Sequence, residues 1–582
     1  MKLRLYISLA LLLVVSSVSA QWLKNIKPDK GKKNFDKPER YFEWFYGQRA
    51  FGLGYIPKDG RVKALTQRDG LRAGYLQQGK QTPQSGGNSQ NPAAITWSAI
   101  GPINIQEGAL AHAGRIRTIA THPNDGNIAY IGAAMGGVWK TTTAGKSWIP
   151  LSDNAYSLAV GALALDPVNP SILYAGTGEQ TQNVDAYYGI GIMKSADSGK
   201  TWVPSGLNQV GAFSKVIVHP INNNTVYAAG SRSGGGVYIT DDAAKTWRKA
   251  AGGLPPGDVT DIALAIDGAT TVLYAALASQ GTFRSNDGGA TWIRVHSYTQ
   301  MRRILLGVNP KNWRDIIDMS VDFEGGLEGI MRSTVGGGEN DDWSAIDGQL
   351  QPELIFGNNN QGWYDAYVVR NPDNADEVLV GGISVWRSSD AGDSWADVGQ
   401  AYQAGGIHPD QHYAAYAKPG SVVSGEGGLL FVANDGGIAV SIDNGESYEI
   451  FQDSLAVTQF YGMAIDQNTD DLTYGGTQDN GTLSGGRNDD WTFESGGDGG
   501  TVVVDEDNSQ RYWYMRPGDG NYPIKVQNGV ESNFSSGITG TDSVGWVKPL
   551  VMDQANNIMY TGTQFFYYST NLSSWVKRSR KL

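Results

Sequence analysis

The chain has 582 residues, of which only 18% are charged, and its formal net charge is −12. This acidic balance excludes general nucleic-acid binding, which needs a basic surface. The chain has no cysteine, so no disulfide supports the fold, and this composition suits a bacterial envelope or extracellular protein. The 77 glycines, with many tryptophans and tyrosines, suit tight turns that join short packed strands.

Residues 1–20 have the pattern of a secretory signal peptide. Lys2 and Arg4 precede an apolar run over residues 9–15, and small residues end the segment at Ala20. This pattern predicts cleavage before Gln21 and a protein that is secreted, periplasmic or held at the cell surface. The run is too short for a membrane anchor, and no later run is long enough to span a bilayer, so we expect no transmembrane segment.

The next two segments do not take part in any repeat. Residues 21–78 are rich in charge and carry an aromatic cluster over residues 41–47. We interpret them as an N-terminal arm whose aromatics pack on the side of the fold, with a glycan-binding platform as the alternative. Residues 79–95 are rich in Gln, Gly, Ser and Asn without apolar periodicity, which predicts a linker.

One short turn sequence recurs through residues 96–582. The pattern Ser/Thr-x-Asp-x-Gly-x-Thr/Ser-Trp is clearest over residues 285–292. Its aspartate can accept backbone hydrogen bonds across the turn, its glycine can take a positive φ, and its tryptophan can pack beneath the corner. A catalytic group is needed once but a turn is needed in every repeat. We therefore expect a structural role for the aspartates at this position: Asp197, Asp242, Asp287, Asp390 and Asp443.

The spacing of the turn predicts the architecture. Asp242 follows Asp197 by 45 residues, and Asp287 follows Asp242 by the same step. Alternating apolar runs before each turn indicate three or four short antiparallel strands per unit, which is the size of one propeller blade. About ten such units fit between Trp97 and Trp575. The prediction is an all-β β-propeller with about ten blades in one large ring. The alternative is a ring of seven or eight blades with extra strands or a partial second propeller.

The turn resembles the Asp-box, or bacterial neuraminidase repeat, and residues 97–575 resemble the sortilin-like and glycosidase-like propeller proteins. The closest matches lie in Gly136–Thr141, Asn434–Gly437 and Gln478–Thr482. The resemblance implies a β-propeller, with a single large ring if the sortilin type applies. It leaves activity open, because Asp-boxes occur on enzymes and on binding proteins alike. Animal sortilins rely on cysteines, and this chain departs from them there.

Candidate ligand-binding residues come from the loops that enter the innermost strands, because these loops surround the mouth of a propeller's channel. Aligning the inner strands brings Arg115, Arg302, Tyr364, Asp498 and Trp546 to one depth. Arginine would bind a carboxylate, and the aromatic rings would bind a sugar face. The alternative is that these side chains only pair with one another and with water across the channel.

The run from His408 to His412 is a second candidate. In an extended chain His408, Asp410 and His412 face one side, where they could bind a divalent metal or perform acid–base chemistry. The alternative is that the two histidines only hydrogen-bond neighbouring loops. We predict no metal and no cofactor.

Carboxylates on the same face are the candidates for catalysis. Glu179 and Asp185 lie in the insertion over residues 177–188, and Asp435 and Asp479 lie in loops between second and third strands. Of these four residues, Glu179, Asp435 and Asp479 are the candidates for catalysis. The xyloglucan-cleaving glycosidases, to which the chain is similar, carry an aspartate two residues before the Gly-Gly of their first blade. Ala134 stands at that position here, and a glycosidase needs a carboxylate pair, so the direct correspondence fails.

These observations lead to two hypotheses about function. The first is a secreted, monomeric β-propeller that binds an extracellular glycan or peptide at the channel mouth, without nucleic acid as a partner. The alternative is a glycoside hydrolase, or another hydrolase, with its carboxylates on the same face. The spacing of those carboxylates in the fold distinguishes the two hypotheses.

Overall fold

The computed structural model describes Lys63, Thr66, Gln67 and residues 101–579, with gaps at 104, 108–109, 182–185, 339–341, 349, 351, 358–359, 419–427, 453, 470–471, 487–490 and 518–521. Apart from those first three residues, the predicted signal peptide, arm and linker lie outside the described residues, and they stay predictions. Within the described part of the chain, no helix is both long enough and apolar enough to cross a membrane.

The described residues form nine four-stranded sheets and one six-stranded sheet, so the ten predicted blades are present. Each blade is built from four consecutive antiparallel strands. The first four blades are β3 (Ile116–Thr121), β4 (Ala129–Ala133), β5 (Gly137–Thr141) and β6 (Ile149–Pro150); β7 (Val160–Leu165), β8 (Leu173–Gly178), β9 (Tyr188–Ser195) and β10 (Val203–Pro204); β11 (Ala212–Val218), β12 (Val226–Ser231), β13 (Gly236–Thr240) and β14 (Arg248–Lys249); and β15 (Val259–Asp267), β16 (Thr270–Leu277), β17 (Gly281–Ser285) and β18 (Ile293–His296).

The next three blades are β19 (Met301–Asn309), β20 (Asn312–Asp322), β21 (Leu327–Ser333) and β22 (Ser344–Ala345); β23 (Tyr367–Arg370), β24 (Val378–Gly381), β25 (Val385–Ser388) and β26 (Ala396–Asp397); and β27 (Gln411–Ala417), β28 (Leu429–Asn434), β29 (Gly437–Ser441) and β30 (Glu449–Ile450). The short helix α4 (Pro352–Phe356) lies in the connection between the fifth and sixth blades.

The last three blades are β31 (Phe460–Ile465), β32 (Thr473–Thr477), β33 (Thr482–Gly485) and β34 (Thr492–Ser495); β35 (Val502–Val504), β36 (Arg511–Tyr514), β37 (Ile524–Gln527) and β38 (Val530–Asn533); and β39 (Leu550–Asp553), β40 (Ile558–Gly562), β41 (Phe566–Ser569) and β42 (Val576–Lys577). A 3-10 turn, η2 (Gln554–Asn556), joins β39 to β40.

The propeller ring closes after the seventh blade. The inner strands pack in chain order from β3 to β27, and β27 then packs back on β3. Ile116, Ile119 and Phe431 belong to the apolar cluster that fills this junction, and the Ala113 N–H donates to the Gly436 carbonyl at 2.7 Å. The prediction of one ring of ten blades is therefore wrong. The alternative, a seven-bladed ring with a partial second propeller, describes the structure, because apolar surface on the first blade is buried by the seventh.

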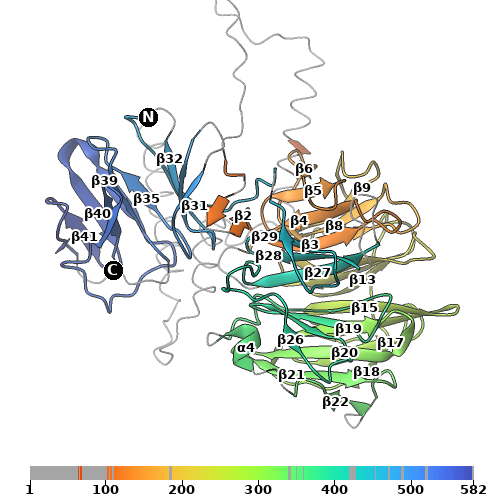
Figure 1. Ribbon diagram of the computed structural model, residues 1–582. Coiled ribbons are helices and arrows are strands. Elements are labelled where there is room, and N and C mark those ends of the chain that lie inside the picture. The colour runs from red at the N-terminus through yellow and green to blue at the C-terminus, as the bar shows by residue number, and fades with distance from the viewer. Residues whose placement is uncertain are drawn as a thin grey trace, which may run out of the picture.

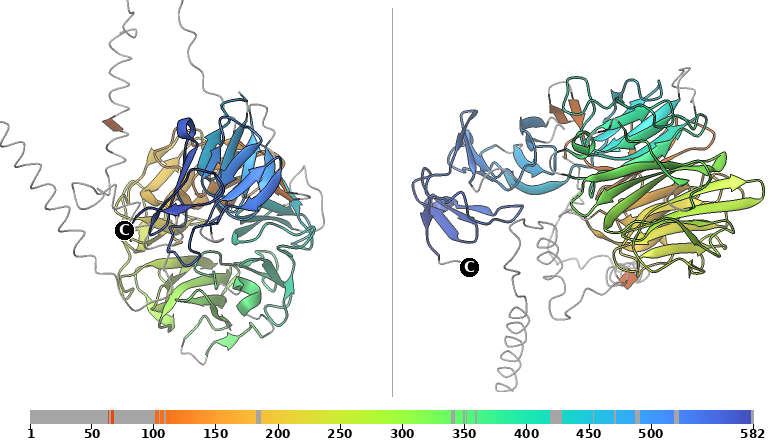
Figure 2. Two further views of the ribbon diagram at one scale, coloured as in Figure 1. Left: turned by 90° about the vertical axis from the view of Figure 1, so that its left-hand side faces the viewer. Right: turned by 90° about the horizontal axis from the view of Figure 1, so that it is seen from below.

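The remaining blades form a three-bladed unit, β31–β42, that stands against one face of the seven-bladed ring (Figures 1 and 2). Its inner strands β31, β35 and β39 pack in order. A hairpin from the start of the described chain, β1 (Ile105–Glu107) and β2 (Leu110–His112), extends its first sheet, where Gln106 pairs in parallel with Thr492. The hairpin leads directly into the first blade, so the chain connects the two parts both before β3 and after β30.

The recurring turns join the third strand of a blade to the fourth. Asp287 accepts hydrogen bonds from the Ser285 hydroxyl at 2.7 Å and from the Ala290 and Thr291 N–H groups at 3.0 and 2.8 Å. Gly289 has a φ of +93°, and the buried Trp292 packs under the corner. Because inner and third strands both start at the channel mouth, these turns lie at the opposite end of each blade. The same hydrogen bonds from the flanking hydroxyls recur at Asp197, Asp242, Asp390 and Asp443.

The fifth blade has a turn that the sequence pattern does not reveal. The Ser333 hydroxyl accepts a bond from the Gly337 N–H at 2.8 Å, as serine does in the other turns. However, Val335 occupies the aspartate position. The blade forms without the carboxylate because its strands and apolar core are sufficient.

We predict that Asp287→Ala lowers the free energy of unfolding by about 1 to 2 kcal/mol, because several turn donors lose their acceptor but remain accessible to water. Urea unfolding followed by tryptophan fluorescence measures this change. Asp373→Ala removes a carboxylate that is 94% exposed and makes a long, solvent-screened contact of 3.8 Å with Lys311. This change should alter the free energy of unfolding by less than about 0.5 kcal/mol. Equal effects of the two variants would contradict a structural role for the turn aspartate.

Candidate functional site

Six buried side chains meet at the mouth of the seven-bladed ring. They come from the entry to β3 and β3 itself, from the loop after β8, from the entry to β23, from β27 and from the loop between β28 and β29. Each of these positions lies at the mouth end of its strand, so four blades converge there. We call these residues the mouth network: Arg115, Arg117, Glu179, Tyr364, His412 and Asp435.

The mouth network is a closed cycle of contacts. The Glu179 carboxylate lies 3.3 Å from Arg115 Nη2 and 3.6 Å from Arg117 Nε. From Arg115 the cycle continues through Nη1, which donates to Tyr364 Oη at 2.9 Å, and the Tyr364 hydroxyl then donates to Asp435. Asp435 Oδ1 lies 2.5 Å from His412 Nε2, and the other ring nitrogen of His412 contacts Arg117 and completes the cycle.

The direction of each hydrogen bond follows from the donors available. Arginine can only donate, so His412 Nδ1 accepts from Arg117 and the histidine proton is on Nε2, where it donates to Asp435. Tyr364 Oη accepts from Arg115 and from Gln478 at 3.0 Å, so its own proton goes to Asp435. With His412 neutral, two arginines balance two carboxylates.

The pKa shifts agree with this assignment. Burial, followed by the charges of Arg117 and Arg115, lowers the pKa of His412 well below its usual value, so the ring stays neutral. Burial raises the pKa of Asp435, whereas hydrogen bonding from Asp479 and Tyr364 and the charge of Arg115 oppose that rise. Asp435 is therefore a fully buried carboxylate that its neighbours hold in one orientation.

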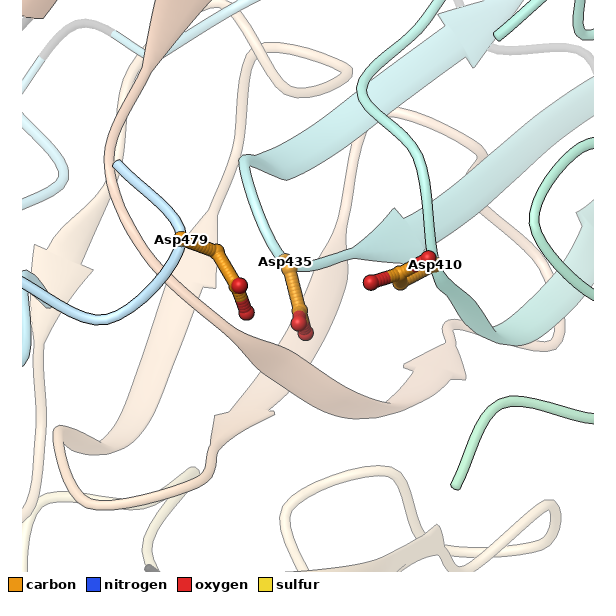
Figure 3. Close-up of side chains that lie close together, drawn as sticks. All are labelled: Asp410, Asp435 and Asp479. Carbon is orange, nitrogen blue, oxygen red and sulfur yellow. The ribbon is translucent and has the colours of Figure 1, made fainter. Parts of the chain in front are cut away.

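Two further carboxylates lie against Asp435 and form the acid cluster, which consists of Asp410, Asp435 and Asp479 (Figure 3). Each contributes an oxygen atom, and these atoms lie within 4.8 Å of one another. Asp479 belongs to the loop between β32 and β33, so the three-bladed unit completes a site that begins in the ring. Gln478 Nε2 donates to Asp435 Oδ2 at 3.2 Å and also to Asp479. Asp410 and Asp479 are half-buried, and they are the members that solvent can reach.

Asp410 has fewer stabilising partners than Asp435. Gln361 Nε2 donates to Asp410 Oδ1 at 2.6 Å and to Asp365 Oδ2 at 3.1 Å. Burial, then the negative charges of Asp435 and Asp479, raises the pKa of Asp410 well above its usual value. Burial and the charge of Asp410 raise the pKa of Asp365 in the same way. Asp410 therefore holds a proton more readily than an ordinary carboxyl does, and carboxyls in unlike environments are what acid–base chemistry needs.

The backbone at the acid cluster is unusual. Asp410 has a φ of +67° and Asp479 a φ of +56°, in the left-handed region that residues other than glycine seldom adopt. Aspartate adopts this region more readily than most residues, and turn residues elsewhere in this protein adopt it too, so the conformation indicates tight turns at both positions. Carboxylate oxygens at this spacing could also hold a hard cation such as Ca²⁺, so metal dependence has to be tested together with catalysis.

The structure brings together most of the residues that the sequence singled out. Arg115, Glu179, Tyr364, His412 and Asp435 belong to the mouth network, Asp410 and Asp479 to the acid cluster, and Asp498 Oδ1 accepts the Asp479 N–H at 3.0 Å. Asp185 lies outside the described residues. Ala134 is buried in the first blade, so that blade offers no carboxylate at this position.

Three of the predicted residues belong to neither the mouth network nor the acid cluster. Arg302 stacks over Trp363 at 5.6 Å and donates to the Phe323 carbonyl at 3.3 Å. Trp546 precedes β39 in the tenth blade, so the expectation that it shares one depth in one channel with Arg115 is wrong, because the ring closes after the seventh blade.

His408 is the third residue outside both groups, although it lies next to the acid cluster and hydrogen-bonds the backbone of Asp479. Its ring packs edge-to-face on His112 at 4.9 Å, and burial lowers its pKa to about 4. Among the described residues, His408, Asp410 and His412 therefore do not form a group of metal ligands, although they alternate along the chain.

Sequence reasoning missed Arg117, Gln361, Asp365 and Gln478. Arg117 follows Arg115 by two residues and so faces the same side of the strand, a signal that was available. Gln478 directly precedes Asp479. Gln361 and Asp365 lie close to Tyr364 in a loop without apolar periodicity, so the sequence does not predict which way their side chains point.

Comparisons with known proteins agree with this fold. A family model described as sortilin, neurotensin receptor 3, matches residues 191–305. A xyloglucanase from Paenibacillus sp is 30% identical over 235 residues, which are 34% of this chain and 22% of that relative. A xyloglucanase from Hypocrea jecorina is 24% identical over 356 residues, which are 53% of this chain and 40% of that relative. The chain thus spans less than half the length of these curated relatives.

A solved structure is similar over a larger part of the chain. The crystal structure of an ancestral GH74 enzyme matches with a TM-score of 0.54 and 14% identity, over 84% of this chain and 78% of that one. At this level of identity the similarity shows the fold. The chain is a β-propeller protein that is similar, in sequence and in fold, to glycosidase propellers.

Proposed function

We propose that the protein is a glycoside hydrolase that cleaves xyloglucan or a related β-glucan at the mouth of the seven-bladed ring. The observation that carries this proposal is the acid cluster, in which half-buried Asp410 and Asp479 flank the fully buried Asp435. The sequence similarity to xyloglucanases supports the substrate class. Among the two hypotheses from the sequence, this one accounts for the convergence of carboxylates, which glycan or peptide binding alone does not require.

The environments of the three carboxylates suggest their roles. Asp410, whose pKa is raised, would donate its proton to the glycosidic oxygen. Asp479 would act as the second carboxylate, because it is also accessible to solvent. Asp435 is fully buried beneath them and would be a positioning residue. One oxygen atom from each of the three carboxylates lies within 4.8 Å of the others, so Asp410 and Asp479 are close enough to act on one glycosidic bond, and the configuration of the first product tells whether they act by retention or by inversion.

Ala134 supports a second candidate function, which is glycan binding without hydrolysis. The first blade lacks the carboxylate that xyloglucan-cleaving relatives are expected to carry there, and Ala134 is fully buried. The proposed hydrolase therefore depends on the seventh and eighth blades for both of its reacting groups.

We predict that Asp410→Asn and Asp479→Asn each lower kcat on xyloglucan by about 10²- to 10⁴-fold, because each removes a group that transfers a proton or attacks the sugar. Release of reducing ends measures the rate, and NMR of the first products gives the anomeric configuration. Asp373→Asn, at an exposed surface site, is the matched control. Activity that disappears with a chelator and returns with Ca²⁺ would indicate metal chemistry, and two fully active variants would refute the assigned roles.

The pH dependence should respond to Gln361. Its amide donates to ionised Asp410 and thereby lowers the pKa of that carboxyl, against the larger effect of burial. Gln361→Leu removes this donor and should raise the pKa of Asp410, so the acid stays protonated to higher pH. We predict that the basic limb of kcat/KM against pH moves upward. A limb that moves downward, or does not move in an active variant, would show that Asp410 is not the acid.

A further inference from the structure

Tyr402 is the most exposed large aromatic side chain of the described residues, with 77% of its surface accessible. It lies in the loop over residues 398–410, which connects β26 to β27 and so enters the seventh blade at the channel mouth. Its φ is +64°, a conformation that is uncommon for a bulky residue and is seldom kept without a reason. The ring packs little of the core, so the fold alone does not explain why an aromatic residue is held there.

Hydrogen bonds hold the Tyr402 loop in place on both sides of the tyrosine. The Gln400 N–H donates to Asp397 Oδ1 at 2.8 Å, and the Ala401 N–H donates to the Ser384 hydroxyl at 3.2 Å. After the tyrosine, the Gln403 N–H donates to the Gln400 carbonyl at 2.9 Å. The loop is therefore a fixed turn that presents the ring to solvent.

The same anchor places this loop beside the acid cluster. The Asp410 N–H donates to the carbonyl of Ile383 at 3.0 Å, which directly precedes Ser384, so Tyr402 and Asp410 are tied to one turn of the sixth blade. Desolvation, followed by the charges of Asp410 and Asp479, raises the pKa of Tyr402. The geometry thus combines an exposed aromatic side chain on a fixed loop with two accessible carboxyls.

We propose that Tyr402 forms a sugar-binding subsite, in which its ring stacks on one pyranose unit of a β-glucan beside Asp410 and Asp479. The apolar C–H face of a pyranose packs well on an aromatic ring, and a loop that is already fixed loses little backbone entropy on binding. This subsite rests on the proposed function and deepens it, because it names the residue that would make the enzyme prefer chains over small glycosides.

The test compares Tyr402→Ala, which removes the ring, with Tyr402→Phe, which keeps it. Binding of cellohexaose and of a xyloglucan oligosaccharide is measured by calorimetry in the Asp479→Asn background, and hydrolysis of xyloglucan and of an aryl β-glucoside is measured in the parent background. Phe566→Ala, which removes a 39% exposed ring in the tenth blade, is the control for loss of a surface aromatic. Thermal unfolding confirms that each variant is folded.

We expect Tyr402→Ala to weaken oligosaccharide binding and to raise KM for xyloglucan roughly five- to tenfold. The rate on the aryl glucoside should stay within about twofold, and Tyr402→Phe and Phe566→Ala should resemble the parent. Hydrolysis with an unchanged KM in Tyr402→Ala would overturn the subsite and leave the proposed function intact. Equal losses in Tyr402→Phe and Tyr402→Ala would overturn stacking, because the hydroxyl would then be responsible.

The two proposals can fail separately. A parent protein that binds oligosaccharides through Tyr402 without cutting them supports the subsite and refutes the hydrolase. A parent protein that neither binds nor cuts these glucans refutes both proposals.

Discussion

The closed, charge-balanced cycle of the mouth network is the interaction on which this site depends. It joins four blades that are far apart in sequence, with Arg115 and Asp435 separated by 320 positions yet both bonded to Tyr364. Every member is buried, so removing one would leave an unpaired charge or polar group in a region without water. Among the described residues the first and last blades of the ring exchange no strand, and this cycle together with the apolar junction between β3 and β27 holds its ends together.

The cycle also separates the roles of the three carboxylates. Asp435 accepts hydrogen bonds from Tyr364 and His412 and is covered by its neighbours, so its orientation is fixed. Among the described residues, only the Gln361 amide donates a hydrogen bond to the Asp410 carboxyl, and the pKa of Asp410 is raised. Environment alone therefore distinguishes chemically identical groups, and this is why their sequence contexts gave no indication of which would be protonated.

The fold was largely predictable because its signal is local. Turns such as Ser285–Trp292 reveal blades one at a time, and ten were expected and found. Ring closure is a long-range property: whether β3 meets β27 or β39 depends on side-chain fit across 300 or more residues, which a repeat pattern does not encode. The error on Trp546 follows from this. The turn of the fifth blade was not predicted, because the motif is recognised by its aspartate and Val335 stands at that position. The turn forms there with the hydrogen bond to the Ser333 hydroxyl.

The hairpin β1–β2 gives the acid cluster a mechanical property. Its strand β1 is paired with β34 of the three-bladed unit, and only a few residues later the chain supplies Arg115 to the ring. Asp479 reaches the cluster from that same unit. A rotation that moved the unit away from the ring would therefore withdraw Asp479 and at the same time pull on the strand that carries Arg115. The distance between Asp410 and Asp479 is thus coupled to the position of the strand that carries Arg115, because the same hairpin connects the three-bladed unit to the ring.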